Sequence, residues 1–173
     1  MLDKQNDTTK QKHYGSYGYT HSHNNNKKKN EAELRGIKPL EIKNEATKML
    51  TLGTLWKQYH AEISKIMTSE LLGLGLIDKA DVQNENPDWP AYKKYFMRGT
   101  SHHMGLDTHD YGLLHEPMKA NMVFTVEPGI YIPSEKFGIR LEDNVVVQEK
   151  GEPFNLMRNI PVEVDEIETL MNA

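Results

Sequence analysis

Apolar residues follow a helical period in the middle of this chain and an alternating period farther along. Between residues 55 and 74 they recur at steps of three and four, which predicts an amphipathic helix with one buried side. Gly73 and Gly75 predict its end, because glycine tolerates the left-handed conformation of a helix C-terminus. The apolar positions are Leu55, Trp56, Tyr59, Ile63, Ile66, Met67, Leu71 and Leu74.

The segments on either side of this helix carry weaker signals. Residues 31–50 predict an irregular, helix-prone lead-in that Pro39 interrupts. Residues 78–92, in which Asn, Pro and Asp cluster, predict a loop. Residues 161–171 place helically spaced apolar residues among Glu and Asp, and so predict a terminal helix.

Two later segments alternate between apolar and polar residues, as strands with one buried face do. In residues 122–127, one face carries Val123, Thr125 and Glu127, and the other carries Phe124 and Val126. In residues 139–147, one face carries Arg140, Glu142 and Asn144, and the other carries Ile139, Leu141, Asp143, Val145 and Val147.

These two strands are predicted to be antiparallel neighbours, because only a modest loop joins them. Pro128 and Gly129 predict a bend after the first strand, since proline fixes φ and glycine accepts a positive φ. In this arrangement Glu127 and Glu142 point into one polar pocket from adjacent strands.

Composition limits the classes of function. The chain has 173 residues, enough for one domain with a core, and its formal net charge of -4 argues against general nucleic-acid binding. It has no cysteine, which excludes disulfides, thiolate zinc sites and a cysteine nucleophile, and which fits a reducing cytoplasm. The sequence shows neither the apolar run of a signal peptide nor a membrane-spanning stretch, so we expect a cytoplasmic protein without a membrane partner.

A boundary in composition falls near residue 30. Residues 1–30 are polar, with Gly-Tyr repeats and an Asn/Lys run, and offer almost nothing to bury, so we expect a disordered tail. His13, His21 and His23 lie in this tail and are expected to bind metal only weakly, since nothing holds them in place. Residues 31–173 are expected to form the folded part of the chain.

Three metal-capable side chains lie in separate parts of the folded region: His102, Glu127 and Glu142. Two carboxylates on one sheet face repel each other, so burying both requires a cation or a shared proton. A divalent metal meets this need, and one imidazole with two carboxylates suits manganese, cobalt, iron(II) or zinc better than calcium. The spacing alone is equally compatible with two solvated strand carboxylates and a loop histidine, because separated single ligands are a weak signal.

Three short motifs between residues 95 and 143 read GTSHHMGLDTHD, VEPG and GIRLED. Together they resemble the C-terminal catalytic half of Xaa-Pro aminopeptidases (aminopeptidase P), which are pita-bread metallopeptidases. The resemblance implies an α+β domain that corresponds to part of a pita-bread (creatinase/aminopeptidase-like) fold, with helices packed on a curved antiparallel sheet. Residues 31–94 and the terminal helix fit the same family more loosely.

The resemblance also implies the members of a metal centre. His102, Glu127 and Glu142 match metal ligands of the family, and a glutamate on the metal, here Glu127, handles the proton. Arg140 is expected to support these ligands without binding the metal itself. The family holds two ions, expected to be manganese, with cobalt, zinc or iron as alternatives.

Two further residues are expected to contact the substrate. The resemblance places His109 beside the scissile bond, where it hydrogen-bonds the carbonyl oxygen and the developing charge. Arg98 stands where the family usually has the first histidine of an HGxSH motif. Its permanent positive charge replaces a titratable group that helps to position substrate, and it opposes metal binding.

The sequence also departs from the family at the second half of the metal site. The family needs two aspartates from an earlier hairpin, in a DxG…D pattern, whereas Asp3 and Asp7 lie in the polar tail. We therefore expect at most one loosely held metal and a truncated reading frame. Asn144, where an aspartate is common, is a smaller departure.

The first functional hypothesis is a metal-dependent hydrolase that removes the N-terminal residue from peptides with proline next. Its partner is a proline-containing peptide, with no nucleic acid and no membrane, and a homo-oligomer stays open. A competing hypothesis is a catalytically dead pita-bread module that binds peptides or proteins, and a third is a degenerate fragment. The unmatched aspartates and Arg98 favour these alternatives, while the nearly intact motifs favour descent from an active enzyme.

Overall fold

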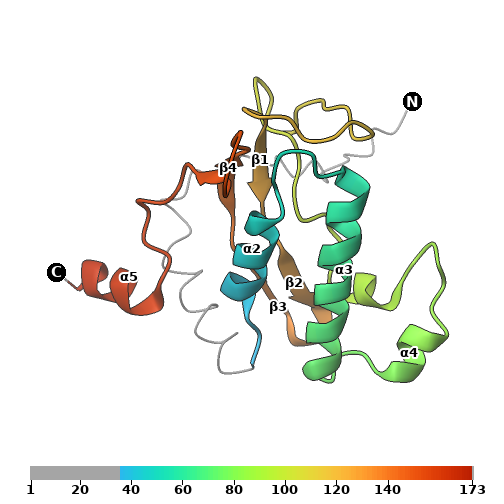
Figure 1. The fold of residues 1–173 in the computed structure, drawn as a ribbon. Helices are drawn as coiled ribbons and strands as arrows, with labels where there is room; N and C mark the ends of the chain where they lie inside the picture. Colours follow the sequence, from blue (N-terminus) through green and yellow to red (C-terminus); the bar gives the residue numbers. More distant parts are fainter. Residues whose placement is uncertain (1–35, 173) are drawn as a thin grey trace, which may run out of the picture.

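Two helices pack against antiparallel strands in the computed structural model, which describes residues 36–172 (Figure 1). Helices α2 (Pro39–Lys48) and α3 (Trp56–Gly73) lie side by side in front of the strands in this view. The other helical elements are short: α4 (Lys79–Gln83), η1 (Ala91–Lys94), η2 (Pro133–Glu135) and the terminal α5 (Val164–Met171). The tail expected at residues 1–30, with its three histidines, lies outside the described residues.

The strands form two small antiparallel sheets. One has the order β1-β4-β5, from β1 (Val123–Val126), β4 (Asp143–Val146) and β5 (Phe154–Asn155). The other pairs β2 (Gly129–Ile132) with β3 (Phe137–Arg140). The predicted antiparallel pairing of the two long segments is confirmed, since Thr125 of β1 lies opposite Asn144 of β4.

The two sheets are halves of one long hairpin that is interrupted in the middle. Val126 pairs with Asp143 on one side of the interruption and Gly129 pairs with Arg140 on the other, in the same register. Glu127 and Glu142 are therefore opposite each other in the gap between the two ladders. The predicted strand over residues 139–147 is thus two strands. Pro128 contributes to the gap because it has no N–H to donate to a ladder.

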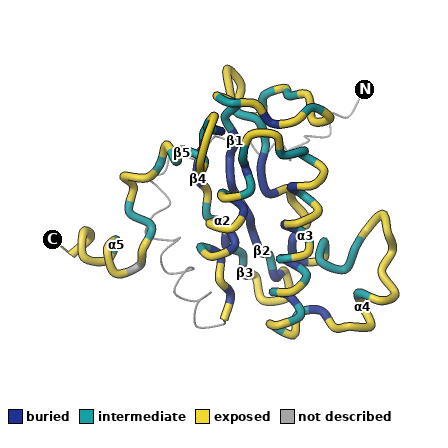
Figure 2. Tube along the Cα trace, in the orientation of Figure 1, coloured by how far each residue is buried: buried dark blue, intermediate teal, exposed yellow. Residues whose placement is uncertain are grey.

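The predicted stripe of α3 lies at the centre of the core. Tyr59, Ile63, Met67 and Leu71 are at most 1% exposed. Full burial of one aliphatic side chain stabilises the fold by about 1.5–3 kcal/mol. They belong to one cluster with Phe124, on the apolar face predicted for β1. Figure 2 shows the same arrangement, with buried residues along the strands and on the helix faces turned toward them.

Helix α3 ends through the predicted glycine. Gly75 has φ +68°, its N–H donates to the Leu72 carbonyl at 3.1 Å, and the Leu76 N–H donates to the Leu71 carbonyl at 3.0 Å. This pair of bonds is the Schellman motif, which satisfies carbonyls that the last helical turn leaves without partners. Gly73, by contrast, is still helical.

Two local predictions are wrong. Pro39 does not interrupt a helix but begins one, because the first N–H of a helix has no intrahelical partner and proline loses nothing there. The predicted loop over residues 78–92 contains α4, which a capping box begins: the Asp78 side chain accepts from the Asp81 N–H at 2.8 Å, and the Asp81 side chain accepts from the Asp78 N–H at 2.9 Å. The Asp-x-x-Asp spacing was a readable signal that the surrounding Asn and Pro residues obscured.

The predicted terminal helix is confirmed as α5, which lies apart from the helices and sheets of the core (Figure 1). Of the helices within residues 36–172, none is both long enough and apolar enough to cross a membrane.

Candidate metal centre

His102 lies on a segment that runs along the free side of β1. The Thr125 N–H donates to the His102 carbonyl at 3.0 Å, and the Glu127 N–H donates to the Thr100 carbonyl at 2.7 Å. The Thr125 hydroxyl accepts from the His102 N–H at 3.0 Å. These bonds hold the backbone of His102 beside the end of β1, close to Glu127, although 25 positions of sequence separate the two residues.

The His102 ring has a fixed orientation. Its Nδ1 lies 2.9 Å from the His103 carbonyl oxygen, and since a carbonyl only accepts, Nδ1 is the donor. Its other nitrogen, Nε2, lies 3.1 Å from Oε1 of Glu127. Nε2 then has two states: it carries a proton that it donates to Glu127, or it turns a lone pair toward a carboxylate oxygen. The second state needs a cation between the two groups.

The two carboxylates share a single guanidinium. The Nη1 atom of Arg140 lies 3.0 Å from Oε2 of Glu127, and its Nη2 atom lies 3.6 Å from Oε2 of Glu142. The Glu127 side chain is 13% exposed and that of Glu142 is 34% exposed, so only part of each is open to water. Arg140 supplies positive charge that two neighbouring carboxylates require, although 3.6 Å is too long for a direct hydrogen bond to Glu142.

The surroundings of Glu142 disfavour its charged form. Burial, followed by the nearby charge of Glu127, raises the pKa of the Glu142 carboxyl above its usual value. Arg140 and His102 act in the opposite direction without cancelling the effect. A divalent cation placed here would stabilise the charged form of Glu142, because it adds an opposite charge at close range.

Within residues 36–172, no three His, Cys, Asp or Glu side chains are grouped closely enough to hold a metal ion as they stand. The three predicted ligands are instead joined in pairs, His102 to Glu127 directly and Glu127 to Glu142 through Arg140. The expected convergence of all three on one point is therefore not found. Their residue types still fit a divalent metal, since an imidazole nitrogen contacts one carboxylate and the second carboxylate comes from the opposite side of the hairpin gap.

The loop after His102 carries His109 and is closed by Asp110. The Asp110 side chain accepts from the N–H groups of Leu106, at 2.9 Å, and Tyr111, at 2.8 Å. This brings the exposed His109 ring to 4.3 Å from the His102 ring, measured between centroids. His109 is thus beside the candidate ligands. No ion pair or hydrogen bond among the described residues joins it to the carboxylates.

Arg98 and His103 differ from the residues that face the carboxylates. Arg98 is exposed, and no contact among the described residues joins it to Glu127 or Glu142. His103 turns away from the carboxylates and stacks on Trp56, with ring centroids 5.9 Å apart, while its ring lies 4.4 Å from Phe124. Burial lowers the pKa of the His103 imidazole, which favours a neutral ring packed against Trp56 and Phe124.

Sequence reasoning missed Lys43, which is buried on α2 and paired with Asp143, the residue after Glu142. A signal was present, because the alternation of residues 139–147 places Asp143 on the apolar face, where a carboxylate needs a partner. The sequence does not say which of its 21 Lys and Arg residues is that partner.

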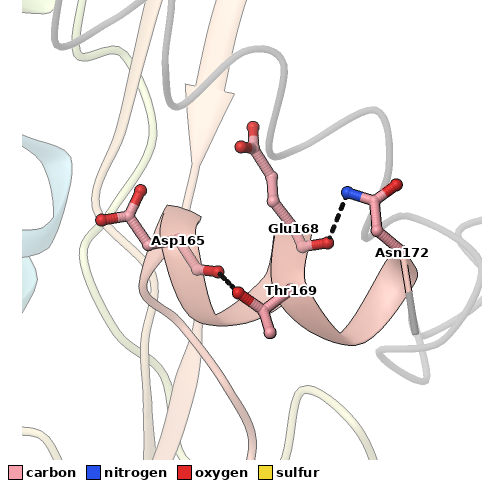
Figure 3. Close-up of a pocket in the computed structure, with 4 residues that line it drawn as sticks. All are labelled: Asp165, Glu168, Thr169 and Asn172. Carbon is pink, nitrogen blue, oxygen red and sulfur yellow. Dashed lines mark hydrogen bonds between the residues drawn. The ribbon is translucent and has the colours of Figure 1, made fainter.

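A hollow on the surface of α5 has no part in this centre. Figure 3 shows its lining residues Asp165, Glu168, Thr169 and Asn172. Thr169 donates to the Asp165 carbonyl at 2.7 Å and Asn172 donates to the Glu168 carbonyl at 2.8 Å, so both donors are satisfied within the helix. The hollow contains none of the predicted site residues.

Comparisons with known proteins agree with the motifs. The profile of metallopeptidase family M24 matches residues 38–149. A Xaa-Pro aminopeptidase from Haemophilus influenzae is 35% identical over 145 residues, which are 77% of this chain and 33% of that protein. A Xaa-Pro aminopeptidase from Escherichia coli is 38% identical over 133 residues, covering 70% and 30%.

The fold agrees as well. The structure of E. coli aminopeptidase P with the inhibitor Pro-Leu matches with a TM-score of 0.67 at 32% identity, covering 83% of this chain and 35% of that one. The chain thus spans about a third of the length of the relatives that it matches.

Proposed function

The chain belongs to metallopeptidase family M24, and we propose on this premise that it supplies one side of the metal centre of a peptidase that removes the N-terminal residue before proline. Its fold is part of the pita-bread fold, as in aminopeptidase P. The proposed substrate class comes from its relatives, which are Xaa-Pro aminopeptidases. We assign residues 31–173 to the catalytic domain and residues 1–30 to a tail outside it.

One observation carries the proposal: Nε2 of His102 faces a Glu127 oxygen at 3.1 Å while Nδ1 is committed to a backbone carbonyl. This arrangement is typical of histidines that bind metal, in which a second partner fixes the ring and leaves the other nitrogen for the ion. We assign His102, Glu127 and Glu142 as ligands of a divalent metal. Manganese is the first expectation, with cobalt, zinc or iron(II) as alternatives.

When bound, the metal would supply Lewis acidity toward the scissile carbonyl and toward an attacking water. The residues of the chain do the rest. Glu127 holds a proton at its carboxylate between attack and departure of the amine, His109 donates to the carbonyl oxygen as charge develops, and Arg98 contacts the peptide. Arg140 restrains both carboxylates and keeps their charge partly neutralised.

A second candidate function is a module that binds peptides without cleaving them. It is favoured by Arg140, which already contacts both carboxylates, and by the two aspartates of the family that this sequence does not match. A single ion cannot both activate water and receive the carbonyl in the geometry that two ions fix. We therefore propose that this chain by itself binds manganese weakly and turns over proline peptides too slowly to measure.

The test has two measurements on the purified chain. Calorimetry with Mn²⁺ is expected to show weak binding that Glu142→Gln removes, and an assay with a proline-containing peptide and excess Mn²⁺ is expected to show no turnover. Binding unaffected by Glu142→Gln contradicts the assigned centre. Turnover that Glu142→Ala abolishes contradicts the proposal that this chain alone is inactive.

A further inference from the structure

A charged pair lies inside the core on the helix side of the hairpin. Lys43 of α2 and Asp143 of β4 form an ion pair, and their side chains are 3% and 5% exposed. Asn155 of β5 donates from Nδ2 to the same Asp143 oxygen at 2.9 Å. We call these three residues the Asp143 anchor, since they join α2, β4 and β5 at a single carboxylate.

Asn155 and Asp143 each have a fixed orientation. The Oδ1 of Asn155 accepts from the Met157 N–H at 2.7 Å, which turns its Nδ2 toward Asp143. The backbone of Asp143 pairs with Val126 in the β1-β4 ladder. Both the main chain and the side chain of Asp143 are therefore held, one residue away from Glu142.

Stability alone does not explain a buried ion pair. The neighbouring positions of α2 that face the core, Ile42 and Ala46, are apolar and at most 3% exposed. Removing two charges from water is costly, and replacing such a pair with apolar residues of similar volume is often neutral or stabilising. An ion pair instead fixes the positions of its two residues, because it forms only when the two side chains are correctly aligned.

Glu142 has few contacts of its own that fix its position. It lies in the gap between β3 and β4, beyond the last ladder pair of each. Its own contact to Arg140, at 3.6 Å, is loose. The next residue, Asp143, is held at both its backbone and its side chain.

We propose that the Asp143 anchor positions Glu142 for metal binding from the opposite face of the hairpin. This inference rests on the proposed function in one respect, which is that Glu142 is a ligand. Among the described residues, Lys43 and Asn155 have no ion pair or side-chain hydrogen bond to a proposed ligand, so they act through Asp143, which both of them contact. Loss of groups that orient a ligand typically weakens metal binding by about 10–100-fold.

The test replaces the ion pair with apolar residues of similar size, in the double variant Lys43→Met/Asp143→Leu of the full chain. We expect its stability in urea to equal or exceed that of wild type, while its affinity for Mn²⁺ falls about tenfold. The matched control is Lys65→Met/Glu62→Leu, which removes an exposed ion pair on α3, with side chains 71% and 55% exposed. The control is expected to keep the wild-type affinity.

A second measurement does not need metal. With a chelator present, amide hydrogen exchange of residues 137–147 is expected to be faster in the double variant than in wild type and in the control. If wild type binds no Mn²⁺, the proposed function fails while the exchange rates still test the anchor. A folded double variant with wild-type affinity and wild-type exchange overturns the anchor and leaves the proposed function standing.

The double variant can fail to fold, and Asn155→Leu then replaces it. This change keeps the ion pair and removes one of the bonds that hold Asp143. Faster exchange over residues 137–147, with a smaller loss of Mn²⁺ affinity, supports the anchor. Exchange identical to that of wild type overturns it.

Discussion

Glu142 and Asp143 are adjacent in the chain and have opposite environments. Asp143 is 4% exposed and has a lysine and an amide within contact. Glu142 is 34% exposed at its side chain, faces a second carboxylate, and has one guanidinium at 3.6 Å. Neutralisation is thus nearly complete on the helix side of the hairpin and incomplete on the side that carries Glu142.

The difference separates a carboxylate that holds the fold from one that is available for binding. A buried charge without a partner is very unfavourable, so Asp143 is surrounded by donors. A metal ligand must keep a lone pair for the ion, so Glu142 is not fully surrounded by donors. Its pKa is raised as a consequence. The following experiments test this contrast.

The largest effect is expected from Lys43→Met. It leaves Asp143 charged in the core without its cation, and the free energy of unfolding should fall by about 3–5 kcal/mol. The control is Arg140→Met, which removes the cation that contacts Glu127 and Glu142. Because Arg140 is 39% exposed, its loss should cost less than about 1 kcal/mol. Urea denaturation measures both, and equal losses would contradict the contrast between the two sides.

Metal binding should depend on Glu142 itself rather than on the net charge of the chain. Glu142→Gln removes a proposed ligand and should weaken Mn²⁺ binding by at least the roughly tenfold that loss of a supporting group costs. Asp107→Asn removes the same charge from an exposed position in the His109 loop and should leave the affinity almost unchanged. Calorimetry distinguishes the two, and similar losses would show only a general effect of net charge.

A smaller effect concerns pH, measured with a chelator present. The folded protein binds the Glu142 proton more tightly than the unfolded chain does, because the pKa of this carboxyl is raised above 4.5 in the fold. Its contribution to stability is therefore present below the ordinary pKa and is lost as the pH rises through the raised value. Glu142→Gln should exceed wild type in stability at neutral pH by less than about 1 kcal/mol, since solvent screens a side chain that is 34% exposed.

Thermal unfolding between about pH 4 and pH 8 checks this prediction. The advantage of Glu142→Gln should shrink as the pH falls, because wild type then carries a neutral carboxyl as well. An advantage that stays constant over the whole range would assign the effect to packing rather than to charge.

The smallest effect is expected from Arg98→His. Arg98 is exposed, so its loss should change the free energy of unfolding by less than about 0.5 kcal/mol. Mn²⁺ affinity should rise by less than about twofold, because salt and solvent screen its charge. Titration at low and high salt checks this, and a large gain in affinity would place Arg98 against the ligands.

Local patterns predicted much of this architecture. The three- and four-residue steps of α3 reflect one buried side, and Gly75 ends the helix by its positive φ. The alternation around Thr125 and Asn144 predicted the pairing of their strands. These features succeed because they depend on neighbours within a few residues. The errors at Pro39 and at α4 arose because Pro and Asn residues, which disfavour helix interiors, were given more weight than the signals that begin a helix.

The sequence by itself determined the residue types of the candidate centre and predicted that Glu127 and Glu142 lie on two neighbouring antiparallel segments. Only the tertiary structure decided that the hairpin is interrupted where they meet, that His102 lies against Glu127, and that Arg140 contacts both carboxylates. It also decided that Lys43, 100 positions before Asp143, is the partner of that buried carboxylate. Such pairings follow from how helices and strands pack into a common core, and residues far apart in a chain carry no local pattern that specifies them.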